Sequence, residues 1–399
     1  MSDPPSTRSA AATAEPRLGA IVIGAGPAGL ATAACLKQVG IETLLLERAA
    51  CVGASWRQHY DRLHLHTDRG HSGLPGLPMP RSYPRYPSRA QVVEYLEGYA
   101  AHFGLAPRVG TTAIRAVREN GYWQIVTDGG TYRAPVLAAA IGAAGVPFRP
   151  NWPGADSFGG DIRHSAEYRN PALSAKRVLV VGFGNSGGEI ALDLAEAGTS
   201  VALAIRGPVN IIPRELFGIP ILAWAILFNR MPPRLADLLT SPLIRLSVGS
   251  MRRLGLRRPA SGPFADVSQR GRVPLIDIGS VAAIRRGSIS IRPDIRRLYP
   301  REVEFVDGRR EPYDAIIAAT GFRPDLRALL PEAAEALDAR GAPKISGAPS
   351  AVPGLYFCGF HISPTGQLRQ IGLEARQIAR HVASRAPADA AFAPAGTGL

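Results

Sequence analysis

The chain has 399 residues, of which 46% are hydrophobic and 20% charged, a composition typical of globular proteins rather than of disordered or membrane-spanning chains. The formal net charge is +14, but the bases are spread as short arginine pairs without interleaved aromatic residues, which disfavours a nucleic-acid partner. Cys35, Cys51 and Cys358 show no CxxC spacing, which disfavours a disulfide framework and predicts a reducing, cytoplasmic compartment.

Two strand, turn, helix, strand units organise the chain. Residues 1–18 are rich in Ser, Ala and Pro and lack the apolar stretch of a signal peptide, so we expect a disordered tail and no export. The first unit follows at residues 19–47, and the second occupies residues 177–206. Two such units predict an α/β protein with two nested Rossmann-like dinucleotide-binding domains.

Weaker patterns complete the predicted order of elements. A helix is expected over 91–103, antiparallel strands over 111–126 around Asn120-Gly121, and a strand over 136–141. Further short strands are predicted over 273–278, 288–292, 313–319 and 355–359, before a final helix over 366–383. We expect the first domain to comprise 19–169 and 319–385, the second domain 170–318 with an insertion at 207–270, and a disordered tail 386–399. The two short crossings between the domains would form a hinge.

The insertion contains the longest apolar run of the chain, Ile219 to Phe228. At about ten residues this run is too short for a spanning helix, which needs roughly 20. We expect a buried or lid segment. A helix lying on a membrane surface stays open as an alternative, because Arg230, Arg234 and Arg245 follow the run.

The first glycine turn predicts a dinucleotide site. Gly24-x-Gly26-x-x-Gly29, which includes Pro27 and Ala28, follows a strand and opens a helix, so its backbone can approach a pyrophosphate. Glu47, followed by Arg48, ends the next strand, where a carboxylate can accept hydrogen bonds from ribose hydroxyls. This pattern suits FAD or NAD; the alternative for Glu47 is an acid on a solvated surface.

The second glycine turn differs from the first in the charge of the residue that ends the next strand. Gly182-x-Gly184-x-x-Gly187 contains Asn185 and Ser186 as further donors to phosphate, but its second strand ends at Arg206. An arginine there can pair with a 2′-phosphate, which favours NADPH, unless it is an ordinary surface arginine. We therefore predict FAD in the first domain and NADPH in the second. Disulfide reductases share this twin fold but need a redox cysteine pair, so they are disfavoured.

The segment between the two units carries a more specific pattern. Phe158, Gly160, His164 and Tyr168 match FxGxxxHxxx(Y/F), and on this pattern the chain resembles the flavin-containing monooxygenases. From about residue 21 to residue 379 it is similar to the YUCCA branch of that family, including the segments 63–67, 182–187, 213–215, 271–279 and 319–322. Two departures from the family pattern are Ala140-Ile141-Gly142 and Gly187-Gly188-Glu189.

The resemblance implies an FAD- and NADPH-dependent monooxygenase that uses a flavin C4a-(hydro)peroxide, with a small-molecule substrate and molecular oxygen. The YUCCA branch implies oxidative decarboxylation of an aryl 2-oxo acid such as indole-3-pyruvate, with Arg214 as one candidate anchor for the carboxylate; the alternative for Arg214 is a salt-bridged surface arginine. Oxygenation of nitrogen or sulfur, oxidation of another carbonyl compound, and an NADPH oxidase that releases peroxide remain alternatives, as does a flavin-binding sensor.

The resemblance also implies roles for single residues. His66 takes the place of an asparagine beside the flavin and is the candidate catalytic residue, with a structural histidine as the alternative. Trp56 resembles the tryptophan of a GGxW turn that flanks the flavin, with a core tryptophan as the alternative. Thr320, Gly321 and Gly359 complete the expected cofactor-binding set, and the helix after Gly366 would direct its positive end at the flavin. His59, His64, His66 and His71 lack an acid or cysteine spaced to complete a metal site, so no metal is expected.

Overall fold

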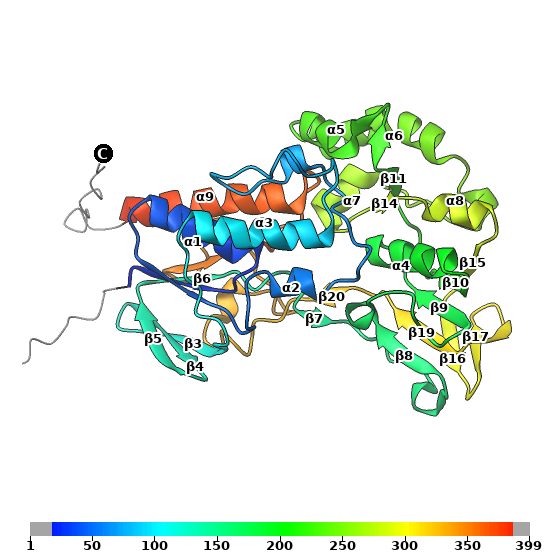
Figure 1. Ribbon diagram of the computed structural model, residues 1–399, viewed down its shortest axis with the longest axis horizontal. Coiled ribbons are helices and arrows are strands. Elements are labelled where there is room, and N and C mark those ends of the chain that lie inside the picture. Colours follow the sequence, from blue (N-terminus) through cyan, green and yellow to red (C-terminus); the bar gives the residue numbers. More distant parts are fainter. Residues whose placement is uncertain (1–17, 386–399) are drawn as a thin grey trace, which may run out of the picture.

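The computed structural model describes residues 18–385, so the predicted tails lie outside the described residues except for Leu18. Two parallel sheets form the two halves of the molecule (Figure 1). The fold class is the predicted one: α/β, with one dinucleotide-binding fold nested in the other.

The first sheet consists of four parallel strands. Their spatial order is β2 (Thr43–Leu46), β1 (Ala20–Ile23), β6 (Val136–Ala139) and β21 (Leu355–Phe357). Alternate residues of β1 enter different cores, because successive side chains of a strand point to opposite faces. Ala20 and Val22 pack under the helices α1 (Pro27–Gln38), α3 (Arg89–His102) and α9 (Gln367–Arg385). Ile21 and Ile23 pack against the antiparallel strands β3 (Ala113–Glu119), β4 (Tyr122–Thr127) and β5 (Gly130–Ala134).

The second sheet repeats this arrangement. Its spatial order is β15 (Ile289–Arg292), β10 (Ser200–Ala204), β9 (Arg177–Val181), β19 (Ala315–Ala318) and β8 (Asp161–His164), all parallel. Val178 and Val180 pack on the side of the helices α4 (Asn185–Glu196) and α8 (Ser280–Arg285). Leu179 and Val181 share a core with the antiparallel strands β16 (Ile295–Leu298) and β17 (Glu302–Phe305), and β18 (Arg310–Pro312) pairs with β17.

The two crossings between the halves lie against each other. The strands β7 (Val146–Pro147) and β20 (Phe322–Arg323) pair antiparallel, and the Phe148 N–H donates to the Gly321 carbonyl at 2.9 Å. Because β8 belongs to the second sheet, the first crossing comes between β7 and β8. The predicted boundary at residue 169 was therefore too late, since β8 is too short and too polar for its pattern to reveal which sheet it joins.

The insertion lies at the upper right of Figure 1, above α4 and the second sheet. It contains β11 (Ile211–Pro213), which pairs with β14 (Leu275–Asp277), and the hairpin of β12 (Glu215–Leu216) and β13 (Ile219–Pro220). The helices α5 (Ile221–Phe228), α6 (Pro233–Val248) and α7 (Pro263–Arg270) follow. We expected the apolar run to be either a buried segment or a lid. In α5 only Leu222 is buried, so the run is not a buried segment. None of the helices in the described part of the chain is long and apolar enough to cross a bilayer.

Local sequence explains several element boundaries. Ser88 and Gln91 form a capping box at the start of α3, which satisfies two backbone N–H groups that the helix leaves unpaired. Asn120 and Gly121 both have positive φ, the conformation that a tight turn between β3 and β4 requires. Short helical segments complete the chain: α2 (Ala54–Arg57), η1 (Arg69–His71), η2 (Ala155–Ser157), η3 (Ser165–Glu167), η4 (Arg252–Leu254) and η5 (Ala334–Ala336).

Candidate cofactor and active site

The first glycine turn is packed against the rest of its sheet on one side and open on the other. Gly24 has φ +105°, and a Cβ there would lie 2.7 Å from the Ala140 carbonyl oxygen; a Cβ at Gly29 would overlap the Gly24 carbonyl oxygen. Gly26 is different. It has an ordinary φ of −83°, and its Cβ would come only within 4.0 Å of Ser55 Oγ. No atom of the protein itself would therefore clash with a side chain at Gly26. This open space fits a position that a pyrophosphate approaches.

Glu47 stands at the mouth of this turn. Its carboxylate accepts a hydrogen bond from the Ala25 N–H at 2.6 Å and another from the Ala49 N–H at 2.9 Å. The acid thus braces the glycine turn, and each oxygen has a second lone pair for a ribose hydroxyl. Arg48 is exposed beside it, while Pro27 begins α1 and Ala28 is buried.

The second glycine turn reproduces the first. Gly182 has φ +102°, and a Cβ there would lie 2.5 Å from the Ala319 carbonyl oxygen. This contact corresponds to the one between a Cβ at Gly24 and the Ala140 carbonyl oxygen. Gly187 would overlap the Gly182 carbonyl, whereas a Cβ at Gly184 meets no atom within 4 Å. The segment Ala140 to Gly142 therefore occupies the place that Ala319 to Gly321 takes in the second fold, despite its different sequence.

Around the second turn, some polar groups are bonded within the protein and others can bind a ligand. Asn185 Oδ1 accepts from the Ile276 N–H at 2.8 Å, which ties α4 to β14 and leaves the Asn185 amide nitrogen as a donor. Ser186 is half-buried in the first turn of α4. A Cβ at Gly188 would lie 2.9 Å from Leu275 Cδ1. Glycine at this position, which departs from the family pattern, therefore leaves room for the Leu275 side chain.

Arg206 follows β10 and is exposed. Within residues 18–385 its guanidinium has no carboxylate within ion-pair distance; only its carbonyl is used, as an acceptor for Arg257 at 3.3 Å. Arg292, on the neighbouring strand β15, is by contrast bound to Glu311 at 2.7 Å. Arg206 is therefore available to an anionic ligand at the end of β10.

His66 lies at the contact between the two halves. Its Nε2 is hydrogen-bonded to Oε1 of Glu189, a residue of α4 that is only 2% exposed. Oε2 of Glu189 has no hydrogen-bond partner in the described structure. Because a carboxylate oxygen accepts, Nε2 of His66 carries the proton, and Nδ1 is the atom that faces other partners. Nearby, burial and the charge of Glu189 raise the pKa of Tyr60, and burial lowers the pKa of His59.

The start of α9 meets the same region. A Cβ at Gly366 would lie 3.1 Å from Thr67 Cγ2 and 3.2 Å from Leu222 Cδ1, so α9, the His66 segment and the insertion converge there. Gly359 approaches α1 closely, since its Cβ would be 2.9 Å from Cβ of Ala28, and its N–H donates to Glu374 at 2.7 Å. The positive end of a 19-residue helix is thus directed at the space beside His66.

The four residues of the Phe158 to Tyr168 pattern all have structural partners. Phe158 is buried in the second core, and a Cβ at Gly160 would lie 2.5 Å from its ring. Tyr168 donates to Asp193 at 2.7 Å. His164 is 0% exposed: its Nδ1 accepts from the Ala166 N–H at 3.1 Å, so Nε2 is the donor to the Gly321 carbonyl at 3.0 Å. Burial lowers the pKa of His164.

This geometry gives the pattern a physical meaning. His164 is the last residue of β8, the strand that follows the first crossing, and Gly321 lies in the second crossing, where Thr320 Oγ1 also donates to the Phe148 carbonyl. The pattern therefore bonds the end of β8 to the second crossing, and Thr320 bonds that crossing to the first. Trp56 has a comparable position, since it packs against the cores of both halves and lies edge-on to His59 at 5.8 Å.

A polar cluster joins the insertion to the first half. The Arg214 guanidinium lies over the Tyr86 ring, 4.2 Å from its centre. Glu215 accepts from Tyr86 at 2.8 Å and pairs with Arg85 at 3.1 Å, so it does not neutralise Arg214. Arg214 also connects to the convergence at Gly366, because its carbonyl accepts from Ile221, which precedes Leu222.

The four histidines do not form a metal centre. His64 bonds the Arg62 carbonyl, His71 bonds Asp68, and His66 bonds Glu189. In the part of the chain that the structure describes, no group of three or more His, Cys, Asp or Glu residues is placed to hold a metal ion.

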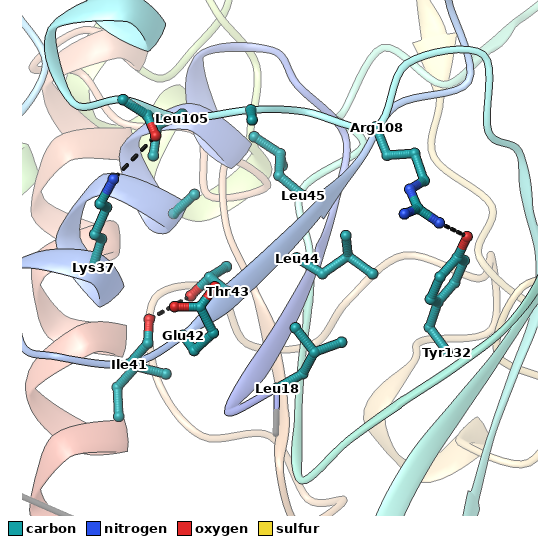
Figure 2. A pocket seen from close by; sticks show the side chains of 13 residues that line it. Leu18, Lys37, Ile41, Glu42, Thr43, Leu44, Leu45, Leu105, Arg108 and Tyr132 are labelled. Carbon is teal, nitrogen blue, oxygen red and sulfur yellow. Dashed lines mark hydrogen bonds between the residues drawn. The ribbon is translucent and has the colours of Figure 1, made fainter. Parts of the chain in front are cut away.

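A surface cavity of about 490 Å³ lies elsewhere, at the edge of the first sheet. Figure 2 shows Lys37 and Arg108 on its walls, with Tyr132 bonded to Arg108. Lys37 Nζ is already used by the Phe103 and Gly104 carbonyls, at 2.9 and 3.0 Å. None of the predicted site residues lines this cavity.

Sequence reasoning missed the partner of His66. Glu189 appeared in it only as part of a departure from a family pattern, although an acid one turn into the helix that follows a glycine turn was a usable signal. Thr67 and Leu222, which meet at Gly366, carried no signal, because their proximity arises only when the insertion folds back over the first half.

Comparisons with known proteins agree with this geometry. A family model described as pyridine nucleotide-disulphide oxidoreductase matches residues 21–213. The chain is 40% identical to indole-3-pyruvate monooxygenase YUCCA6 of Arabidopsis thaliana over 315 residues, 76% of each chain. It is 35% identical to indole-3-pyruvate monooxygenase YUCCA4 of Oryza sativa over 387 residues, 92% of this chain and 88% of the relative. A solved flavin monooxygenase mutant from Stenotrophomonas maltophilia superposes with TM-score 0.73 at 25% identity, covering 92% of this chain and 98% of that one.

Proposed function

The chain belongs to the YUCCA family of flavin-containing monooxygenases and is an FAD- and NADPH-dependent monooxygenase, and from this premise we propose that it acts on an aryl 2-oxo acid such as indole-3-pyruvate. The 2-oxo acid, molecular oxygen, NADPH and a proton would give the arylacetic acid, carbon dioxide, water and NADP⁺. The observation that carries this proposal is Arg214, a half-buried cation without a carboxylate partner among the described residues, next to the convergence of α9, His66 and the insertion.

The two glycine turns fit the two cofactors. Gly26 and Gly184 leave open space beside a helix N-terminus, which suits a pyrophosphate at each turn. Glu47 would hold the ribose of FAD, and Arg206 the 2′-phosphate of NADPH. Bound at these two turns, the cofactors would supply hydride transfer from nicotinamide to flavin and the activation of oxygen.

Arg214 would hold the substrate carboxylate. A guanidinium can bind a carboxylate through two parallel hydrogen bonds, and stacking on Tyr86 keeps its plane fixed while the edge with the N–H groups stays available. Glu215 cannot compete, because Arg85 and Tyr86 already occupy it. The aryl group would then face the apolar residues of α5, of which Leu222 reaches Gly366.

His66 would act as a hydrogen-bonding group whose orientation Glu189 sets. With Nε2 bonded to Glu189, Nδ1 can face the cofactor or substrate, and the ring cannot turn without leaving a buried carboxylate unpaired. Glu189 is in this proposal a positioning residue. With its Nε2 proton donated to Glu189, His66 would present Nδ1 as a hydrogen-bond acceptor to the cofactor or the substrate.

The test is a coupling measurement with indole-3-pyruvate. Oxygen uptake and NADPH oxidation are followed together with indole-3-acetate, carbon dioxide and hydrogen peroxide. One acetate and one carbon dioxide per NADPH support the proposal. Peroxide alone, together with tight coupling on a thioether or an amine, would exclude the 2-oxo acid and favour oxygenation of sulfur or nitrogen; peroxide with every compound would favour an oxidase.

A variant pair separates substrate binding from general damage. Arg214→Gln should raise KM for the 2-oxo acid by about 10- to 100-fold, the loss of a charge-assisted bond of about 1.5–3 kcal/mol, with a smaller effect on kcat. Arg85→Gln, in the same cluster but already paired with Glu215, is the matched control.

We also propose a cytoplasmic location. Support comes from Cys35, Cys51 and Cys358, all of which are free thiols in the described structure, as expected in a reducing compartment.

A further inference from the structure

The helix α6 buries two polar residues among the apolar ones on its inner side. Its buried side chains include Asp237 and Thr240, and the Asp237 carboxylate accepts the Phe264 and Ala265 N–H groups at 2.9 and 3.0 Å. Asp237 thereby satisfies the first turn of α7, which lacks a capping side chain of its own. These two bonds fix which side of α6 faces the protein.

The opposite side of α6 is apolar and uncovered. Its leucines recur at helical spacing and are 36% to 81% exposed; they are Leu235, Leu238, Leu239, Leu243 and Leu246, called here the leucine face. The same insertion exposes Leu227 in α5 and Phe217 at the tip of the β12–β13 hairpin, where Phe217 has φ +54°. A continuous exposed stripe of this kind marks an interaction surface rather than ordinary scattered surface residues.

Positive charge borders the leucine face. Arg234 and Arg245 lie on the same row of α6 as Leu238, four residues before it and seven after it, and Arg230 precedes the helix. All three arginines are exposed, and none is ion-paired within the ranges that the structure covers. The nearby acids are unavailable, because Asp237 is buried and Glu215 is bound to Arg85.

This charge decides between the possible occupants. A second copy of the chain on the leucine face would bring one arginine border against the other, with no acid to separate them. A bilayer with anionic headgroups complements both features, since leucines can enter the boundary between headgroups and acyl chains while arginines remain at the phosphates.

We infer that the leucine face is a peripheral docking surface for an anionic lipid bilayer. The contact lies in the membrane plane. It needs no spanning helix, and none is found among the described residues. Docking would bring the insertion, whose Leu222 reaches Gly366 beside the candidate site, next to the bilayer surface. The inference goes beyond the proposed function, because it does not depend on which substrate is oxidised.

The test is vesicle flotation with the full-length, flavin-loaded protein. Vesicles of phosphatidylcholine alone are compared with vesicles that also contain phosphatidylglycerol. The protein should float with the anionic vesicles, and added salt should weaken this binding. Arg234→Gln with Arg245→Gln should lower the partition coefficient about 25-fold, at roughly fivefold per arginine, and Leu238→Ser should lower it about tenfold.

Matched variants guard against unrelated effects. Leu373→Ser and Arg286→Gln alter an exposed leucine and an exposed arginine elsewhere and should leave flotation unchanged. Bound flavin and melting temperature verify that each variant is folded. Absence of flotation with folded wild-type protein overturns the inference, as does equal flotation with neutral vesicles. A concentration-dependent dimer that Leu238→Ser dissolves, without vesicle binding, would assign the face to a second copy.

Discussion

Replacing Arg206 by glutamine removes the cation that we expect to read the 2′-phosphate of NADPH. The structure gives this side chain the properties that the role demands: it follows β10, it is exposed, and it has no carboxylate partner in the described part of the chain. Glutamine keeps much of the length and two N–H donors but loses the charge. The substitution therefore tests electrostatic recognition rather than packing.

The size of the effect follows from the exposure of the arginine. A hydrogen bond to a charged group contributes about 1.5–3 kcal/mol, which is about 10- to 100-fold in affinity. Because Arg206 is exposed, salt screening should place the result near the lower end of this range at ionic strengths of about 0.1 M, and higher at low salt. NADH lacks the 2′-phosphate, so its kinetics should change little.

The assay is kcat/KM for NADPH and for NADH, measured by flavin reduction at two salt concentrations. Arg206→Gln should lower the NADPH to NADH ratio about tenfold at moderate salt. Arg286→Gln, an exposed arginine after α8, is the control and should leave the ratio unchanged. An unaltered ratio in Arg206→Gln would refute the assignment of the second fold's ligand.

Four other substitutions test the geometry. Gly26→Ala should fold normally but lose most of its flavin, whereas Gly184→Ala should keep the flavin and show a raised KM for NADPH, because each Cβ would point into space that only a ligand fills. Glu189→Gln should increase the peroxide released per NADPH, because His66 would lose the carboxylate that fixes its ring. His164→Gln should make the free energy of unfolding less dependent on pH in acid. The pKa of His164 in the folded protein lies below its ordinary 6.5, so the unfolded state takes up the proton first as pH falls. Wild-type stability should therefore decrease below about pH 6.5, by at most about 1.4 kcal/mol per pH unit from this group.

Each of these expectations has a separate check. Absorbance of bound flavin and circular dichroism distinguish loss of ligand from loss of fold in the glycine variants, and a fully yellow Gly26→Ala protein would contradict the first. Product per NADPH measures coupling in Glu189→Gln, with Glu196→Gln on the exposed end of α4 as control; equal coupling in the two variants would remove Glu189 from the mechanism. Urea unfolding between pH 5 and 7 tests His164, and parallel wild-type and variant curves would argue against a buried neutral imidazole.

Much of the fold could be predicted because its signals are local. A glycine turn between a strand and a helix involves only a few adjacent residues, and the acid or arginine that follows the next strand is held at a nearly constant separation. Gly24, Gly26 and Gly29 with Glu47, and the corresponding residues from Gly182 to Arg206, could therefore be recognised without a structure. The class of enzyme and its cofactors followed from these residues together with the Phe158 to Tyr168 pattern.

The sequence by itself thus determined two dinucleotide folds and the sign of the charged residue that follows the second strand of each. Tertiary structure decided the rest, because it depended on residues distant in the chain. His66 and Glu189 are 123 residues apart, and His164 and Gly321 are 157 apart. The membership of β8 in the second sheet depends on its pairing with β19. The side of α6 that faces outward is also decided by distant residues. Asp237 is buried and accepts hydrogen bonds from the Phe264 and Ala265 N–H groups of α7, and the leucines lie on the opposite side. A buried carboxylate needs such partners, whereas leucines can stay exposed at a smaller cost.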